Sequence, residues 1–150
     1  MDITITKLVI TFSVHATEDL EKNMESLSNI IPDGILEQME INIDELEGGY
    51  QNPIDFVNIA FTRASIIEKI LRYFSSITPS EEKTKLGIEF DERFDQKNNM
   101  FYIRLDKEEL FHGKVSITSS ANIIKLAMKL RAFTKDVNFR EFLISKNILN

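Results

Sequence analysis

The residues of this chain that could do chemistry are basic and aromatic side chains between Met100 and Phe133. The last part of this stretch alternates between two sets of residues, and the apolar set is Ile124, Leu126, Met128, Leu130 and Ala132. The intervening set is Lys125, Ala127, Lys129 and Arg131. Such alternation is typical of a strand with one buried face. It predicts a strand over residues 122–133 whose outer face is positively charged.

Two further strands, over residues 100–105 and 114–118, would extend that charged face if they lie beside it. Tyr102 and Arg104 would then share a face with Lys114, Ser116, Lys125, Lys129 and Arg131. Basic groups around an aromatic ring on an open sheet suit phosphate contacts and base stacking in RNA. Antiparallel sheets commonly leave one polar face to water, so the pattern also fits a solvated face without a ligand.

Signatures of catalysis are absent from the sequence. It contains no glycine-rich dinucleotide or phosphate loop, no Gly-x-Ser-x-Gly elbow and no His-Glu-x-x-His motif. Cysteine is missing, and the two histidines, His15 and His112, lie far apart along the chain. Acidic residues are abundant, but no spacing among them points to a magnesium site. We therefore expect no enzyme, no cofactor and no metal site.

Length and composition predict one domain. The chain has 150 residues, of which 43% are hydrophobic and 28% charged, as in ordinary globular proteins. No apolar run is long enough to span a bilayer, so we expect no membrane partner and a cytoplasmic location.

Charge is divided unevenly along the chain, whose net charge is -6. Residues 1–60 contain two Lys or Arg against twelve Asp or Glu, whereas residues 61–150 contain sixteen against twelve. Such an asymmetry can mark a charged partner. It also fits an acidic, solvated surface near the first helix.

Hydrophobic periodicity predicts the order of the elements. We expect strands over residues 3–14, 54–62, 100–105, 114–118 and 122–133, with residues 35–47 divided between a helical turn and a strand. We expect helices over residues 18–30, 64–75, 78–90 and 135–146 and a short turn over 107–111. The helix over 78–90 is weakly apolar and should lie on the surface. Thr17 should cap the first helix, and Asp106 the short turn. The predicted fold is α+β, with a mixed, largely antiparallel sheet and helices packed on one face.

Three short motifs occur in order along the chain. They are His15-Ala16-Thr17-Glu18-Asp19, then Gly48-Gly49-Tyr50-Gln51-Asn52-Pro53-Ile54, then Arg104-Leu105-Asp106-Lys107 followed by Gly113. Together they resemble the archaeal RNA-binding domain family once predicted to contain exosome subunits. The resemblance implies a fold like that of the ribosomal protein that binds 5S ribosomal RNA. It also implies RNA binding, or association with RNA-processing or ribosome-related machinery, without catalytic activity.

The candidate RNA-binding residues combine these motifs with the charged face. They are His15, Tyr50, Asn52, Tyr102, Arg104, Lys107, Lys125, Lys129 and Arg131. Helix caps account for much of the motif pattern, but they explain less well the side chains of His15, Tyr50, Asn52, Arg104 and Lys107. We expect a non-catalytic RNA-binding module. The alternative is a protein-interaction or assembly subunit, within a protein complex or a homodimer, that uses the acidic N-terminal half.

Overall fold

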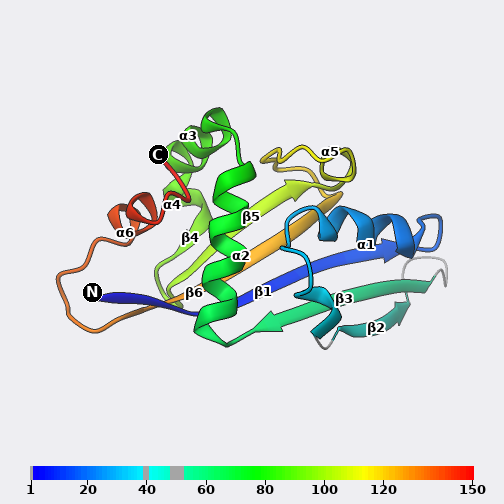
Figure 1. Cartoon of the computed structure of the whole chain (residues 1–150), viewed down its shortest axis with the longest axis horizontal. Coiled ribbons are helices and arrows are strands. Elements are labelled where there is room, and N and C mark those ends of the chain that lie inside the picture. The colour runs from blue at the N-terminus through cyan, green and yellow to red at the C-terminus, as the bar shows by residue number, and fades with distance from the viewer. Residues whose placement is uncertain (1, 39–40, 48–52) are drawn as a thin grey trace.

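A single antiparallel sheet organises the computed structural model, which describes residues 2–38, 41–47 and 53–150 (Figure 1). The strands of the described residues are β1 (Ile3–His15), β2 (Asn42–Glu47), β3 (Pro53–Phe61), β4 (Phe94–Asp95), β5 (Met100–Asp106) and β6 (Ile123–Ala132). They lie in the order β2-β3-β1-β6-β5-β4, and every pairing is antiparallel. The predicted α+β fold with a largely antiparallel sheet is confirmed.

The helices gather on one face of this sheet, as Figure 1 shows for α1 and α2. They are α1 (Leu20–Ser28), the 3-10 helix η1 (Leu36–Gln38), α2 (Ala64–Ile77), α3 (Ser80–Ile88), α4 (Phe90–Arg93), α5 (Lys107–Phe111) and α6 (Phe139–Ser145). The central helix α2 crosses over the middle of the sheet (Figure 1). On the opposite face of the neighbouring strands β1, β6 and β5, which we call the open face, most side chains are half-buried or exposed.

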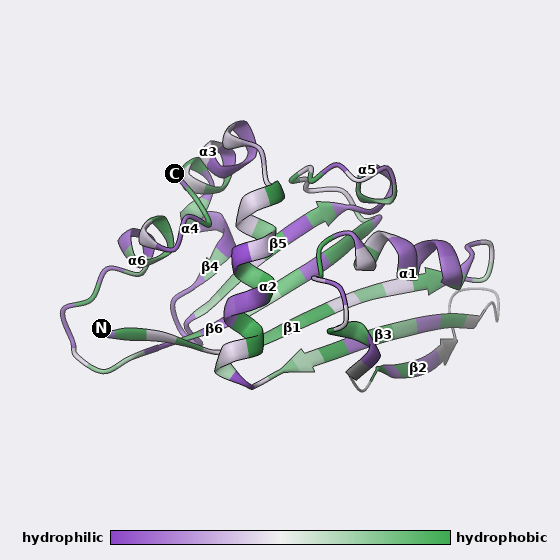
Figure 2. Cartoon of the chain, viewed as in Figure 1, coloured by the Kyte–Doolittle hydropathy of each residue, from purple (hydrophilic) through white to green (hydrophobic). Residues whose placement is uncertain are grey.

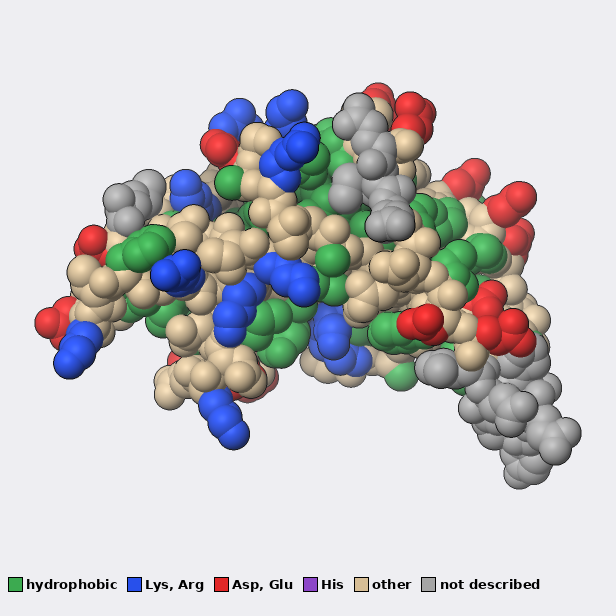
Figure 3. Space-filling view, turned by 90° about the horizontal axis from the view of Figure 1, so that it is seen from below, with side chains coloured by type: hydrophobic (Ala, Val, Ile, Leu, Met, Phe, Trp, Pro, Cys, Tyr) green, Lys and Arg blue, Asp and Glu red, His purple; other side chains and the backbone are tan. Residues whose placement is uncertain are grey.

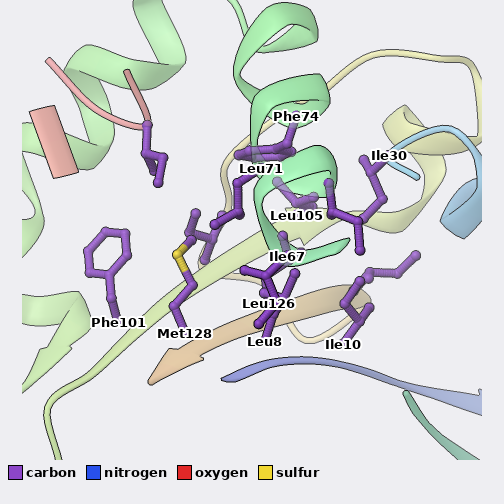
Figure 4. Close-up of a cluster of buried hydrophobic side chains, with 14 of the residues drawn as sticks. Leu8, Ile10, Ile30, Ile67, Leu71, Phe74, Phe101, Leu105, Leu126 and Met128 are labelled. Carbon is purple, nitrogen blue, oxygen red and sulfur yellow. The ribbon is translucent and has the colours of Figure 1, made fainter. Parts of the chain in front are cut away.

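Alternate residues of the central strands form the core. In β6 the predicted apolar set from Ile124 to Leu130 is almost fully buried, and in β1 the same holds from Leu8 to Val14. Figure 4 shows side chains of both strands pointing toward Ile67, Leu71 and Phe74 of α2. Hydropathy drawn on the ribbon shows the same alternation along the strands (Figure 2). Burial of this apolar area is the main force that holds helices and sheet together.

The strand predicted over residues 114–118 is wrong. Only one bridge joins it to the sheet, between Leu105 and Ile117. Side chains of α3 form hydrogen bonds with the other backbone groups of Ile117: Glu82 accepts from its N–H at 2.7 Å, and Lys85 donates to its carbonyl at 2.9 Å. The helix α3 is therefore tied to this segment, and Leu86 on it is fully buried, contrary to the expected surface position.

Of the two predicted helix caps, one is wrong and one is confirmed. Asp19, not Thr17, caps α1, because its carboxylate accepts from the backbone N–H of Glu21 at 2.9 Å. Residues before it form a turn in which the N–H of Glu18 donates to the carbonyl of His15. The cap at Asp106 is confirmed, since its carboxylate accepts from the N–H of Glu109 at 2.9 Å. Capping by a carboxylate stabilises a helix start by about 1 kcal/mol.

Candidate nucleic-acid interface

The open face of the sheet collects basic side chains from three neighbouring strands. The antiparallel register places Arg104 of β5 directly opposite Lys125 of β6, and Lys129 of β6 directly opposite Lys7 of β1. Arg131 lies further along β6 on the same face. We call these five residues the basic face. Tyr102 lies beside it on β5, opposite Ala127.

Carbonyl groups and aromatic rings contact several of these cations. The guanidinium of Arg104 donates to the carbonyl of Ser120 at 3.0 Å, and the ammonium of Lys129 donates to the carbonyl of Asn98. The ammonium of Lys125 lies 5.3 Å from the ring centre of Tyr102. Among the described residues, no ion pair includes a member of the basic face.

Like charges directly opposite each other destabilise a sheet, by up to about 1 kcal/mol for each pair. The basic face contains two such pairs, Arg104 with Lys125 and Lys7 with Lys129. Since no member of either pair forms an ion pair within the described part of the chain, the face has an excess of positive charge. An excess of one sign over a surface attracts ligands of the opposite sign.

Negative charge gathers at another end of the molecule. Figure 3, seen from below, shows Lys and Arg over the middle and left of that view, where a few Asp and Glu also lie, and most Asp and Glu toward its right-hand end. The edge strand β2 contributes exposed Asp44 and Glu45, and α1 contributes exposed Glu21 and Glu25. The charge division expected from the two halves of the sequence is partly a division in space, because four of the five members of the basic face come from residues 61–150 and only Lys7 comes from the first half.

Lys107 occupies a different environment from the basic face. Its side chain is only 7% exposed, and its ammonium donates to the carbonyl of Ser13 at 2.7 Å and to the carboxylate of Glu18 at 2.9 Å. The other oxygen of Glu18 accepts from the backbone N–H of His15 at 3.1 Å. We call this arrangement the lysine clamp. It joins the end of β1, the turn before α1 and the start of α5.

The pKa of Glu18 reflects this clamp. Burial by itself raises the pKa of the carboxyl, but the hydrogen bond from Lys107, the N–H of His15 and the charge of Lys107 together hold it below its ordinary value. The carboxylate therefore stays ionised and neutralises Lys107. On α1 and α5, Lys22 and Glu108 form a second ion pair at 3.2 Å.

His15 and Lys107 also line a polar pocket of about 590 Å³ between α1, α5 and the start of β6. Its other lining residues include Asn23, Ser26 and Asn122.

Of the predicted RNA-binding residues, the structure brings five together on or beside the open face, namely Tyr102, Arg104, Lys125, Lys129 and Arg131. It places His15 and Lys107 in this pocket instead. Tyr50 and Asn52 lie outside the described residues.

Lys114 and Ser116, expected on the charged face, do not extend it because their segment is not a strand. Lys114 lies instead 3.9 Å from the carboxylate of Glu109. Conversely, the sequence reasoning omitted Lys7 from the candidates. Its alternation with Leu8 and Ile10 was a usable signal, because it places Lys7 on the outer face of β1.

Other kinds of site find no support in the described ranges. No group of three or more His, Cys, Asp or Glu side chains there is arranged to hold a metal ion. None of the helices described is both long and apolar enough to cross a membrane.

An open antiparallel sheet with a basic face and helices behind it defines a class of small nucleic-acid-binding domain, and comparison with known proteins agrees with this class. A family model described as RNA binding matches residues 7–130. The chain belongs to this RNA-binding family.

Two relatives cover most of the chain. The RNA-binding protein PAB1135 of Pyrococcus abyssi is 31% identical over 121 residues, which cover 80% of this chain and 78% of that protein. The uncharacterized protein MJ0213 of Methanocaldococcus jannaschii is 27% identical over 122 residues, which cover 81% of this chain and 81% of that protein. The crystal structure of protein AF2318 from Archaeoglobus fulgidus has a TM-score of 0.81 at 26% identity, and covers 95% of this chain and 99% of that one.

Proposed function

We propose that this protein is a non-catalytic RNA-binding module that holds the phosphate backbone of RNA on its basic face. The observation that carries the proposal is that two pairs of positively charged residues lie opposite each other on neighbouring strands, Arg104 with Lys125 and Lys7 with Lys129. Each pair costs stability in the free protein, and a bound phosphate between the two cations would remove that cost. The name of the relative from Pyrococcus abyssi supports RNA as the polyanion.

Geometry favours phosphate contacts over reading of bases by these cations. The two pairs lie at different positions along β6, four residue steps apart, at Lys125 and at Lys129. With a rise of about 3.3 Å for each strand residue, that separation is about 13 Å. An RNA backbone following the strands would meet one pair and then the other. The net charge of -6 is unevenly distributed: residues 61–150, which contain four of the five members of the basic face, have sixteen Lys or Arg against twelve Asp or Glu.

Salt dependence tests the proposal directly. Fluorescence anisotropy with labelled RNA at about 50 mM and about 200 mM salt should show affinity falling steeply, because neutralised phosphates release counterions. The double variant Lys7→Gln with Lys129→Gln should bind more weakly and with a shallower salt slope. The matched control, Lys69→Gln with Lys146→Gln, removes two exposed charges from the helical side and should leave both unchanged. Absence of RNA binding at low salt would contradict the proposal.

We further infer that the module works in the cytoplasm with RNA-processing or ribosome-related machinery. A fold related to the 5S-binding ribosomal protein and a link to the exosome, both implied by the motif resemblance, stay predictions. Recovery of ribosomal or processing RNA after crosslinking in cells would test this assignment. Recovery of no RNA above the level of the Lys7→Gln, Lys129→Gln variant would contradict it.

A protein-assembly role is the second candidate, and the acidic end favours it. The edge strand β2 is paired only with β3 within the described ranges and presents exposed Asp44 and Glu45. A basic partner chain could dock there. Charge reversal at Asp44, Glu45 and Glu21 tests this role by pull-down, and it avoids Glu18, whose loss would break the lysine clamp. Unchanged recovery of partners would exclude the acidic end as their docking surface.

A further inference from the structure

A hollow at the edge of the open face is lined by side chains that phosphate contacts do not fully explain. It has a volume of about 330 Å³ and is lined by Glu92, Arg93, Tyr102, Arg104, Ser119 and Lys125. This volume is at the small end of the range for ligand pockets. The lining combines an aromatic ring, cations, a carboxylate and a hydroxyl. Cations and hydroxyls bind phosphates, but binding of a phosphate explains neither the aromatic face nor the carboxylate.

The groups in this hollow divide into fixed and available ones. Arg93 is buried and held by Glu89, whose carboxylate accepts from its guanidinium at 2.7 and 3.0 Å. Arg104 is steadied by its hydrogen bond to the carbonyl of Ser120. Glu92 is exposed and belongs to no ion pair among the described residues. Glu92 and Ser119 can therefore offer hydrogen bonds to a ligand.

Lys125 covers the ring of Tyr102 in the free protein, with its ammonium 5.3 Å from the ring centre. Tyr102 is half-buried, and a cation over an aromatic ring gains about 0.5–1 kcal/mol at an exposed site. A phosphate offers the same ammonium a charge-assisted hydrogen bond, which is stronger. Binding of a phosphate next to the ring would draw Lys125 away and leave the face of Tyr102 free for a flat, apolar partner.

We propose that this hollow holds one unstacked nucleotide, so that the protein prefers unpaired RNA to duplex RNA. The base lies against Tyr102, its phosphate contacts Arg104 and Lys125, and Glu92 and Ser119 hydrogen-bond the base edge or the ribose 2′-hydroxyl. Bases of a duplex are stacked on one another and cannot enter a hollow, so a duplex would contact only the cations. This inference rests on the proposed function, because it assumes that RNA lies on the basic face.

Three RNAs with the same number of phosphates test the inference with the wild-type protein. They are a single strand, a blunt duplex and an abasic oligomer that keeps the backbone but lacks bases. Stacking of one base on an aromatic side chain gives about a fivefold to a hundredfold gain in affinity. The single strand should therefore bind at least about fivefold more tightly than the duplex and the abasic oligomer, in anisotropy titrations at the same salt concentration.

Variants then assign the gain to Tyr102. Tyr102→Leu should lower single-strand affinity by about fivefold or more and leave duplex affinity unchanged, while Tyr102→Phe keeps the ring and should retain the preference. Tyr73→Leu on α2, where Tyr73 is 37% exposed, is the matched control and should change neither. Circular dichroism checks that each variant is folded, and the abasic comparison needs no variant at all.

The outcomes separate this inference from the proposed function. If all three RNAs bind equally and with a steep salt dependence, the hollow holds no base, yet the phosphate-binding face stands. If no RNA binds at low salt, both proposals are wrong. A preference for the single strand that survives in Tyr102→Leu would place the base elsewhere and overturn the assignment to this hollow.

Discussion

Lysines serve opposite purposes in two regions of this molecule, the basic face and the lysine clamp. On the basic face, Lys125 and Lys129 lie opposite other cations; the ammonium of Lys129 donates to a carbonyl, and that of Lys125 lies over a ring. In the lysine clamp, Lys107 is buried and neutralised by Glu18. A charge that is paired within the fold holds elements together and is unavailable to a ligand. A charge that lies opposite another of the same sign weakens the fold slightly and remains available to an anion.

Breaking the clamp should produce the largest effect. Lys107→Met would leave Glu18 partly buried without its cation and the carbonyl of Ser13 without a donor. We expect the free energy of unfolding to fall by about 3 kcal/mol, measured by urea denaturation. The matched control is Lys22→Met, whose ion pair with Glu108 is well exposed and should cost less than about 1 kcal/mol. Equal losses in the two variants would show that the clamp is no more important than a surface pair.

Neutralising the pair of Arg104 and Lys125 on the basic face should lower RNA affinity without lowering the stability of the fold. Arg104→Gln with Lys125→Gln should lower RNA affinity roughly tenfold to hundredfold at low salt, and reduce the salt slope for a single strand by about 1.4. The urea midpoint should stay the same or rise slightly, because a like-charge pair is removed. A fall in stability without a change in RNA binding would reverse the roles that we assign to the two regions.

Acid should weaken the lysine clamp. The folded pKa of Glu18 is lower than its ordinary value of 4.5, so its contribution to stability is present above that value. The contribution is lost as the pH falls through the folded pKa. The stability difference between wild type and Glu18→Gln should therefore shrink between about pH 7 and about pH 3, in urea titrations at each pH. A difference that stays constant over this range would mean that Glu18 does not act through its charge.

Relief of the second like-charge pair should give the smallest effect. Lys7→Gln removes one cation from the pair with Lys129, so the free energy of unfolding should rise by a few tenths of a kcal/mol. The same change should lower RNA affinity by a few-fold. Lys69→Gln on α2 serves as the control for the loss of one exposed positive charge. A destabilising effect of Lys7→Gln would show that this pair is not a cost in the free protein.

Regular alternation made much of the fold predictable from the sequence. The strands over residues 3–14 and 122–133 and the helix over 64–75 were predicted within about two residues of β1, β6 and α2. Their long apolar sets leave only one face that can be buried. The segment 114–118 was mistaken for a strand because Val115 and Ile117 alternate correctly, yet their burial depends on side chains of α3 that come from elsewhere in the chain.

The candidate site was predictable to the same extent and for the same reason. Tyr102, Arg104 and Lys125 were expected on one face because side chains of a strand alternate between faces. The role of Lys107 could not be inferred from its neighbours. Its motif places two carboxylates next to it, Glu108 and Glu109, but the carboxylate that pairs with it comes from Glu18, 89 residues away.

The sequence by itself therefore determined which side of each strand is apolar and which is basic, because alternation is a local property with a period of two residues. Only the tertiary structure decided which cations lie opposite each other and which are neutralised. Register, strand order and the packing of α1 on α5 join residues far apart in the chain, and no local pattern encodes those distances. The basic stretch from Met100 to Phe133 becomes a candidate RNA-binding surface through its pairing with β1, which contributes Lys7.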